Sequence, residues 1–267
     1  MMLSPDENEI LGIGLLPDKT AIVTGVLGDG SCFVHSLLLS LSPIEYLTLD
    51  EDLRKDYVKE VRSILADNLS TKVWVNQDSF TVALITYISN FLQKLMVGKP
   101  VRNIKIKEVM KVNPTFKKLS NEDIDKIVAI IQKDTKDLGK VKGILGDSLG
   151  NKKLADVLVD EIIKVTHEKA VANIRNTLEY IEDWNFKYVS DSLGVMPIFI
   201  NKHDGTLYNY GISREYYQSV KKVVLVAYID EAHFESIGII DGDVIRRTFN
   251  PKDPLISGLI KAIESTL

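Results

Sequence analysis

Cysteine is nearly absent from this chain of 267 residues, in which Cys32 is the only one. A single thiol cannot form an intrachain disulfide, and such scarcity is typical of proteins kept in a reducing, intracellular compartment. One cysteine and four scattered histidines also provide no Cys/His cluster of the kind that binds zinc, and the H-E-x-x-H pattern of zinc hydrolases does not occur. We therefore expect chemistry that needs no metal and no other cofactor.

The sequence also lacks a long unbroken hydrophobic run and a large excess of charge of either sign. Its apolar stretch at 10–27 is interrupted by Pro17-Asp18-Lys19 and has acidic flanks, so we expect neither a signal peptide nor a membrane span. The net charge of −4 disfavours broad affinity for nucleic acid. The composition predicts a globular cytoplasmic protein, and its many Ile, Lys and Asn residues also suit a viral or bacterial effector in a host's cytoplasm.

The lone cysteine lies where a loop is predicted to become a helix. A short β-branched run at 21–24 precedes a glycine-rich segment, and apolar side chains then recur every four residues from Phe33 onward. A lone cysteine is more often a small buried residue, but Asp29 between two glycines favours an exposed, tightly bent loop. The free amides and the dipole at a helix N-terminus lower a thiol's pKa, and the same amides can hold an oxyanion. Cys32 is therefore a candidate nucleophile.

A cysteine nucleophile needs a base, and His233 is the best placed of the four histidines. It begins a predicted strand at 233–240, which follows an apolar strand at 222–229 and ends in the hairpin turn Asp241-Gly242. Glu235 lies two residues on and shares a sheet face with His233, so its carboxylate can orient the imidazole. The other histidines are predicted to be structural or exposed: His35 beside Cys32 in an apolar helix, His167 on a charged helix and His203 in a loop.

Three segments, in this order, resemble the ovarian tumour (OTU) family of cysteine proteases. Asp29-Gly30-Ser31-Cys32 is similar to the family's D-G-x-C box, and residues 233–237 (His-Phe-Glu-Ser-Ile) are similar to its late H-aromatic-x-S-I/V strand. Between them, residues 184–200 are similar to the family's helix-then-strand segment W…L-G-V-x-I-x-V. The resemblance implies a papain-like deubiquitinase that hydrolyses isopeptide bonds of ubiquitin, polyubiquitin or a ubiquitin-like modifier through a thioester intermediate.

The same resemblance assigns roles to individual residues. It implies that Cys32 is the nucleophile and His233 the general base, and that Asp29 with the backbone of Gly30 and Ser31 builds the oxyanion loop. Many members of the family carry Asn or Asp two residues after the histidine, where this chain has a glutamate that is longer by one methylene. The residue that orients the imidazole therefore stays open between three carboxylates: Glu235, Asp29 and Asp230.

Two alternatives follow from the same residues. The departure at Glu235 leaves room for a catalytically weak or inactive relative that binds ubiquitin without cleaving it. The glycines at 25 and 30 after a strand also match the G-x-x-x-x-G part of a phosphate loop, but Ser31-Cys32 stands where the essential Lys-Ser/Thr pair belongs, which disfavours nucleotide binding.

The expected fold class is α+β (α/β-like), a papain-like OTU fold with a small central sheet flanked by helices. Strands are predicted at 21–25, 195–201, 222–229, 233–240 and 244–249. We interpret residues 1–267 as a single catalytic domain, with about 99–150 as an inserted helical arm that shapes substrate choice.

Most of the remaining chain is predicted to be helical. Helices are expected from a capping box at Thr48–Glu51, over 79–96, from Ser120 onward and over about 154–180, and the glycines at 139, 143, 146 and 150 suggest a flexible stretch. The core face of the first helix is predicted to consist of Leu53, Tyr57, Val61, Ile64 and Leu65.

Basic residues gather within the arm. Residues 99–118 contain seven lysines and arginines and a single acid, Glu108. This segment is either a solvated face or a contact patch for a second ubiquitin, an acidic partner or a membrane surface.

Overall fold

The computed structural model describes residues 1–12, 19–112, 117–208, 220–230 and 233–265, so Pro17 and Asp18 lie outside the described residues. The chain forms two compact units, one made of residues 1–68 and 172–267 and the other of residues 69–171. The predicted arm at 99–150 falls within the second unit. No helix in the described ranges combines the length and the apolar character needed to cross a bilayer.

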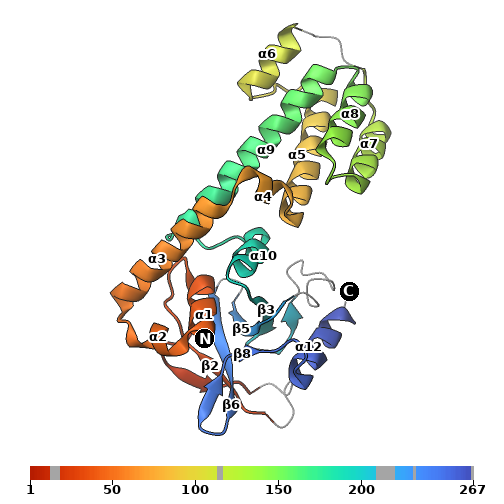
Figure 1. Cartoon of the computed structure of the whole chain (residues 1–267). Helices are drawn as coiled ribbons and strands as arrows, with labels where there is room; N and C mark the ends of the chain where they lie inside the picture. Colours follow the sequence, from red (N-terminus) through yellow and green to blue (C-terminus); the bar gives the residue numbers. More distant parts are fainter. Residues whose placement is uncertain (13–18, 113–116, 209–219, 231–232, 266–267) are drawn as a thin grey trace. The chain divides into compact units, whose positions relative to one another are not determined.

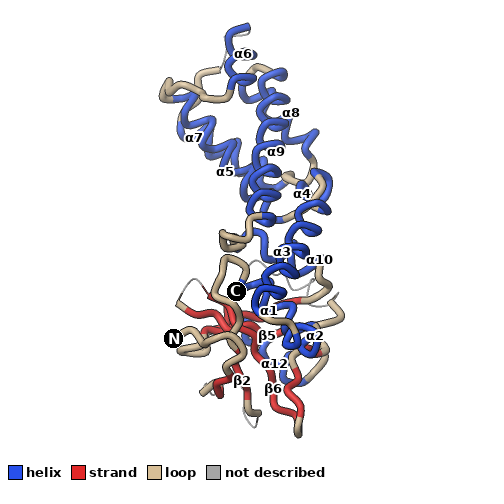
Figure 2. The backbone as a smooth tube through the Cα atoms, turned by 90° about the vertical axis from the view of Figure 1, so that its left-hand side faces the viewer, coloured by secondary structure: helices blue, strands red, loops and turns tan. Residues whose placement is uncertain are grey.

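The first unit is built on one mixed sheet (Figures 1 and 2). The described strands are β1 (Asn8–Ile10), β2 (Ala21–Thr24), β3 (Met196–Asn201), β4 (Leu207–Tyr208), β5 (Val223–Ile229), β6 (His233–Asp241), β7 (Val244–Arg246) and β8 (Thr248–Phe249). Their order is β1-β2-β6-β5-β3-β4, with β7 paired to β6 and β8 to β5. Strands β3 and β5 are parallel and the other pairs antiparallel. A mixed sheet with helices confirms the predicted α+β class.

Helices cover both faces of the central strands. Strand β5 reads as an almost continuous apolar run because both of its faces are buried. On one face, Leu225 and Ile237 pack against Ile256 of α12 (Pro254–Glu264). On the other, the rings of Phe199 and Phe234 meet aromatic rings of α1 (Cys32–Leu41) and α10 (Asp183–Ser192). The sheet thereby fixes α1, whose first residue is Cys32, against β6, whose first residue is His233.

Helix α3 (Glu51–Asn68) buries a face that includes Leu65 of the predicted core face but otherwise differs from it. Leu53 and Ile64 are each 51% exposed, whereas Arg54 and Arg62 are buried. Two arginines can be buried here because each has oxygen partners: Asp6 accepts a bidentate hydrogen bond from Arg54, and Arg62 donates to backbone carbonyls. The predicted cap is also wrong. Thr48 ends the short helix α2 (Pro43–Thr48), and the carboxylate of Asp50 accepts the amide of Leu53.

The second unit is helical. It contains α4 (Thr71–Val75), α5 (Asp78–Met96), α6 (Ile104–Val112), α7 (Asn121–Lys133), α8 (Leu138–Leu149) and most of α9 (Lys152–Arg175). Ser120 caps α7 as predicted, through a capping box with Asp123. The glycine-rich stretch is a helix rather than a flexible segment. Gly146 lets Lys152 approach closely, and Gly150, with φ +68°, ends α8 in the left-handed conformation.

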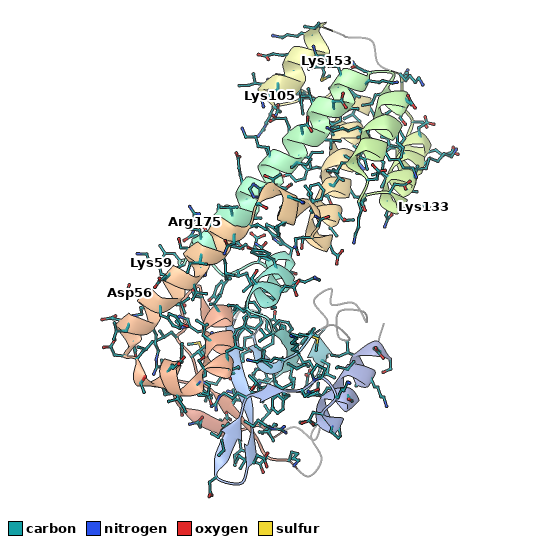
Figure 3. All side chains as sticks on the ribbon, viewed as in Figure 1. Asp56, Lys59, Lys105, Lys133, Lys153 and Arg175 are labelled. Atoms are coloured by element: carbon teal, nitrogen blue, oxygen red, sulfur yellow. The ribbon has the colours of Figure 1, made fainter. Side chains whose placement is uncertain are left out.

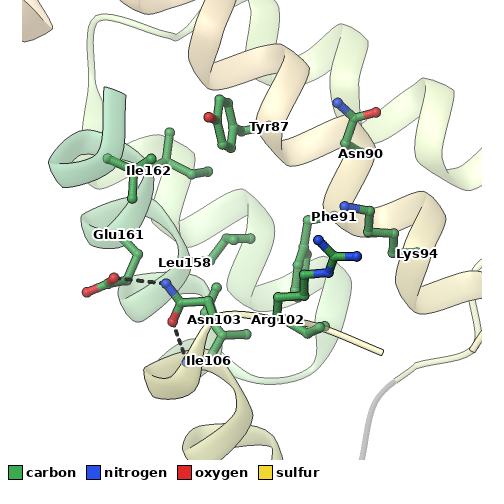
Figure 4. Close-up of a pocket in the computed structure, with 12 residues that line it drawn as sticks. Tyr87, Asn90, Phe91, Lys94, Arg102, Asn103, Ile106, Leu158, Glu161 and Ile162 are labelled. Atoms are coloured by element: carbon green, nitrogen blue, oxygen red, sulfur yellow. Dashed lines mark hydrogen bonds between the residues drawn. The ribbon is translucent and has the colours of Figure 1, made fainter. Parts of the chain in front are cut away.

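A cavity of about 260 Å³ lies within this helical unit (Figure 4). Buried Phe91, Leu158 and Ile162 contribute to its apolar lining. Asn103 lines one side of the cavity and is held by two hydrogen bonds. Its Oδ1 accepts the amide of Ile106 at 3.1 Å, and its Nδ2 donates to Oε2 of Glu161 at 3.0 Å. The acids and bases labelled in Figure 3 are exposed: Asp56, Lys59, Lys105, Lys133, Lys153 and Arg175.

Candidate active site

The loop before α1 is a tight turn organised by Asp29. Its Oδ1 accepts the amide of Ser31 at 2.8 Å, and its backbone carbonyl accepts the amide of Cys32 at 3.4 Å. Its Oδ2 lies 3.2 Å from Nε2 of buried His35. Burial opposes ionisation of Asp29, but the interactions with His35 and the Ser31 amide outweigh it, so the pKa of this carboxyl is lowered. Of the two predicted oxyanion-loop amides, that of Ser31 is thus already engaged, whereas among the described residues the Gly30 amide has no hydrogen-bond partner.

Arg62 holds this loop from the opposite side. Its side chain is completely buried, and Nη1 donates to the Gly30 carbonyl at 2.9 Å and to the Ser31 hydroxyl at 2.8 Å. The same guanidinium also donates to four carbonyls of a following segment: Asn173, Ile174, Asn176 and Glu179. Burial lowers the pKa of Arg62 to about 10, which leaves it charged at neutral pH. The arginine therefore ties residues 173–179 to the cysteine loop.

Cys32 does not have the exposed thiol with a lowered pKa that its sequence context predicts. The residue is 1% exposed, and burial raises the pKa of its thiol to about 11, with a smaller contribution from the Asp29 charge. The backbone amide of Phe234 acts in the opposite direction, as a hydrogen bond to the sulfur. The desolvation that raises the pKa of the Cys32 thiol is thus larger than the lowering expected from the helix N-terminus.

His233 enters the same site from β6. Phe234, whose amide is hydrogen-bonded to the Cys32 sulfur, directly follows His233 in the strand. The start of β6 therefore lies beside the start of α1. The His233 side chain is 8% exposed, and its Nε2 lacks a hydrogen-bond partner within the described ranges. Burial, followed by the charge of Lys202, lowers the pKa of His233 to about 4, although Asp29 acts in the opposite direction. The cysteine and the histidine are therefore both neutral in this conformation at pH 7.

Of the three candidate carboxylates, Glu235 makes a described contact with the imidazole. Its Oε1 lies 3.7 Å from His233 Nε2, which is too long for a hydrogen bond, and accepts the amide of Leu3 at 2.7 Å. Burial raises the pKa of Glu235, and this effect outweighs the hydrogen bond from the Leu3 amide and the charge of Lys202, which both lower it. Asp230 is exposed and lies 3.1 Å from His203 Nε2.

Sequence reasoning missed Arg62 and Lys202. One signal for Arg62 was available, because Arg54, Val58, Arg62 and Leu65 recur at helical spacing, and two arginines on one apolar stripe indicate buried partners. Lys202 follows β3 in a turn, and nothing local marks it as a buried residue. In the part of the chain that the structure describes, no group of three or more His, Cys, Asp or Glu side chains is placed to hold a metal ion.

Comparison with known proteins finds distant structural matches. No family model matches the sequence, and no curated protein matches it. Among solved structures, the chain is similar to an ovarian tumour (OTU) domain in complex with ubiquitin, with 13% identity, a TM-score of 0.40, and coverage of 97% of this chain and 91% of the other. An identity this low says nothing about which residues act in this chain.

Proposed function

We propose that this protein is a cysteine-type deubiquitinase that hydrolyses isopeptide bonds of ubiquitin or of a ubiquitin-like modifier. The observation that carries the proposal is the hydrogen bond from the Phe234 amide to the Cys32 sulfur, which joins the D-G-x-C segment to the strand that begins with His233. The proposed nucleophile comes from one of these segments, and the proposed base and its carboxylate, Glu235, come from the other.

The neutral resting state defines how the pair would work. His233 with its low pKa is unprotonated, so it can take the proton of Cys32 as the sulfur attacks the isopeptide carbonyl. The carbon–nitrogen bond then breaks while His233 passes that proton to the leaving lysine amine. Water attacks the resulting thioester, with His233 accepting its proton, and releases the free carboxylate and the thiol.

The cysteine loop supplies a candidate site for the oxyanion. The Gly30 amide has no partner among the described residues. This donor lies two residues before the nucleophile in the chain, and an amide of that kind can stabilise the negative charge that develops on the attacked carbonyl. Because Cys32 is 1% exposed, the proposed reaction requires that the sulfur become accessible when substrate binds.

Cleavage of a panel of differently linked diubiquitins tests the proposal. Wild-type protein should release monoubiquitin from at least one linkage, and Cys32→Ala should release none while circular dichroism shows an intact fold. His233→Ala should lower kcat by about 10³-fold or more, since loss of the base removes proton transfer in both half-reactions. Cleavage by Cys32→Ala at the wild-type rate would contradict the proposed nucleophile.

A second candidate function is ubiquitin binding without cleavage. The buried thiol with its raised pKa and the 3.7 Å gap between His233 and Glu235 favour it. Binding of wild-type protein to ubiquitin by calorimetry, together with no cleavage of any diubiquitin and no reaction with a ubiquitin carrying a C-terminal electrophile, would select this alternative.

A further inference from the structure

Lys202 lies at the centre of a short chain of charges that ends beside the candidate base. Its Nζ is 2.8 Å from Oε2 of Glu9 and 3.3 Å from Oε2 of Glu235, and it donates to the carbonyl of Met1 at 3.1 Å. The lysine side chain is only 7% exposed and that of Glu235 is fully buried. A lysine is rarely buried to this extent unless it is paired, so these contacts define its role.

The sheet fixes both ends of the Lys202–Glu235 pair. Lys202 follows β3 directly, and its backbone amide donates to the Tyr228 carbonyl of β5 at 3.0 Å. Glu235 faces Ala227 across the β5–β6 ladder, and alanine leaves space for a carboxylate there. The Leu3 amide binds the other oxygen of Glu235 at 2.7 Å. One carboxylate is therefore held through both oxygens, and the oxygen that Leu3 binds is the one facing His233.

The geometry points to Lys202 as a positioning residue that holds the Glu235 carboxylate beside the imidazole of His233, an inference that rests on the proposed function. A glutamate has one more rotatable bond than the Asp or Asn that a shorter link to the imidazole would use, so it needs fixed partners to keep a single orientation. Lys202 and Leu3 supply those partners. The lysine acts on the base through Glu235 and through its own charge.

Four described charged or titratable groups act on or adjoin His233: Asp29 in the cysteine loop, Cys32 at the start of α1, Lys202 after β3 and Glu235 in β6. Glu9 of β1 forms an ion pair with Lys202 and acts on His233 only indirectly, through that lysine. Lys202 is the cation among them and lowers the pKa of His233. Replacing it with a neutral residue of similar length should therefore raise the pKa of His233, regardless of what the enzyme cleaves.

Proton NMR titration of the imidazole signals is a direct readout, because the chain has four histidines that single substitutions can assign. In Lys202→Met the midpoint of His233 should rise by about one pH unit relative to wild type. Lys202→Arg keeps the charge and should keep the wild-type midpoint. Glu9→Gln removes only the outer partner, and the midpoint should again stay unchanged. An unaltered midpoint in Lys202→Met would overturn the inference.

Kinetics on a cleavable diubiquitin separate positioning from a general structural role. Lys202→Met should lower kcat about 10-fold or more with KM changed less than threefold. Because the lysine positions the base through the carboxylate, Lys202→Met should lower kcat much less in the Glu235→Gln background than in wild type, whereas fully additive losses would overturn the inference. The double variant also replaces the buried pair by neutral groups, so it provides a folded protein if Lys202→Met alone is unstable. Absence of cleavage by wild type would refute the proposed function, and the titration would still decide the role of Lys202.

Discussion

At Cys32 two influences on the acidity of a thiol oppose each other. The residue begins a helix, where amides and the dipole favour a thiolate, but it is buried and lies near the ionised Asp29, which favour the neutral thiol. The pKa of about 11 shows that burial dominates. His233 is subject to the same desolvation, which keeps it neutral. The pair is therefore set for proton transfer during attack rather than for a preformed thiolate–imidazolium ion pair.

The buried His233 makes stability depend on pH in a defined direction. Its pKa falls from 6.5 to about 4 on folding, so the unfolded chain takes up the proton first as the solution is acidified. This contribution is present above pH 6.5 and is lost as pH falls toward 4. Between pH 7 and pH 4.5, the free energy of unfolding of wild type should fall by about 2 kcal/mol more than that of His233→Gln. Urea denaturation at the two pH values measures this difference, and an equal loss in both proteins would contradict a buried neutral imidazole.

At the scale of secondary structure, the cysteine loop depends on elements that lie far from it in sequence. Helix α3 contributes Arg62, whose guanidinium holds the Gly30 carbonyl together with carbonyls of residues 173–179. The backbone of Leu178 and Glu179 packs so closely on Gly30 that a Cβ there would lie 2.7 Å from it. The loop is therefore clamped between α3 and the segment that follows α9, and glycine is required because of close approach.

This clamp predicts opposite effects for two glycine substitutions. Gly30→Ala should destabilise the protein by about 1–3 kcal/mol, because backbone atoms must move to admit the methyl group. Gly258→Ala is the matched control, since a Cβ there meets nothing within 4 Å and the residue lies inside α12. Alanine should stabilise that helix by up to about 1 kcal/mol. Chemical denaturation of both variants provides the comparison, and a neutral Gly30→Ala would show that residues 178–179 do not hold the loop.

At the scale of the whole molecule, the sequence predicted the central strands well and the edges of the sheet poorly. Strands β5 and β6 stand out because apolar runs are bounded by turn residues such as Asp241-Gly242. Strands β1 and β4 have three and two residues with no buried position, so no hydrophobic pattern marks them. They exist because neighbouring strands offer free ladder groups, which is information held by the tertiary structure alone.

The candidate site divides in the same way. Cys32, His233 and Glu235 were identified from local motifs, and the structure places the first two on adjoining elements. Arg62 and Lys202 could not be assigned, because their roles depend on carbonyls and carboxylates contributed from elsewhere in the chain. The acidity of Cys32 was predicted in the wrong direction, since burial is a property of the assembled unit rather than of a helix terminus.

Mass spectrometry of the protein after reaction with ubiquitin bearing a C-terminal electrophile tests the central claim most directly. The account predicts one added ubiquitin per chain, with the modified peptide containing Cys32, and no adduct in Cys32→Ala. A wild-type protein that stays unmodified, or an adduct that maps to another residue, would contradict it.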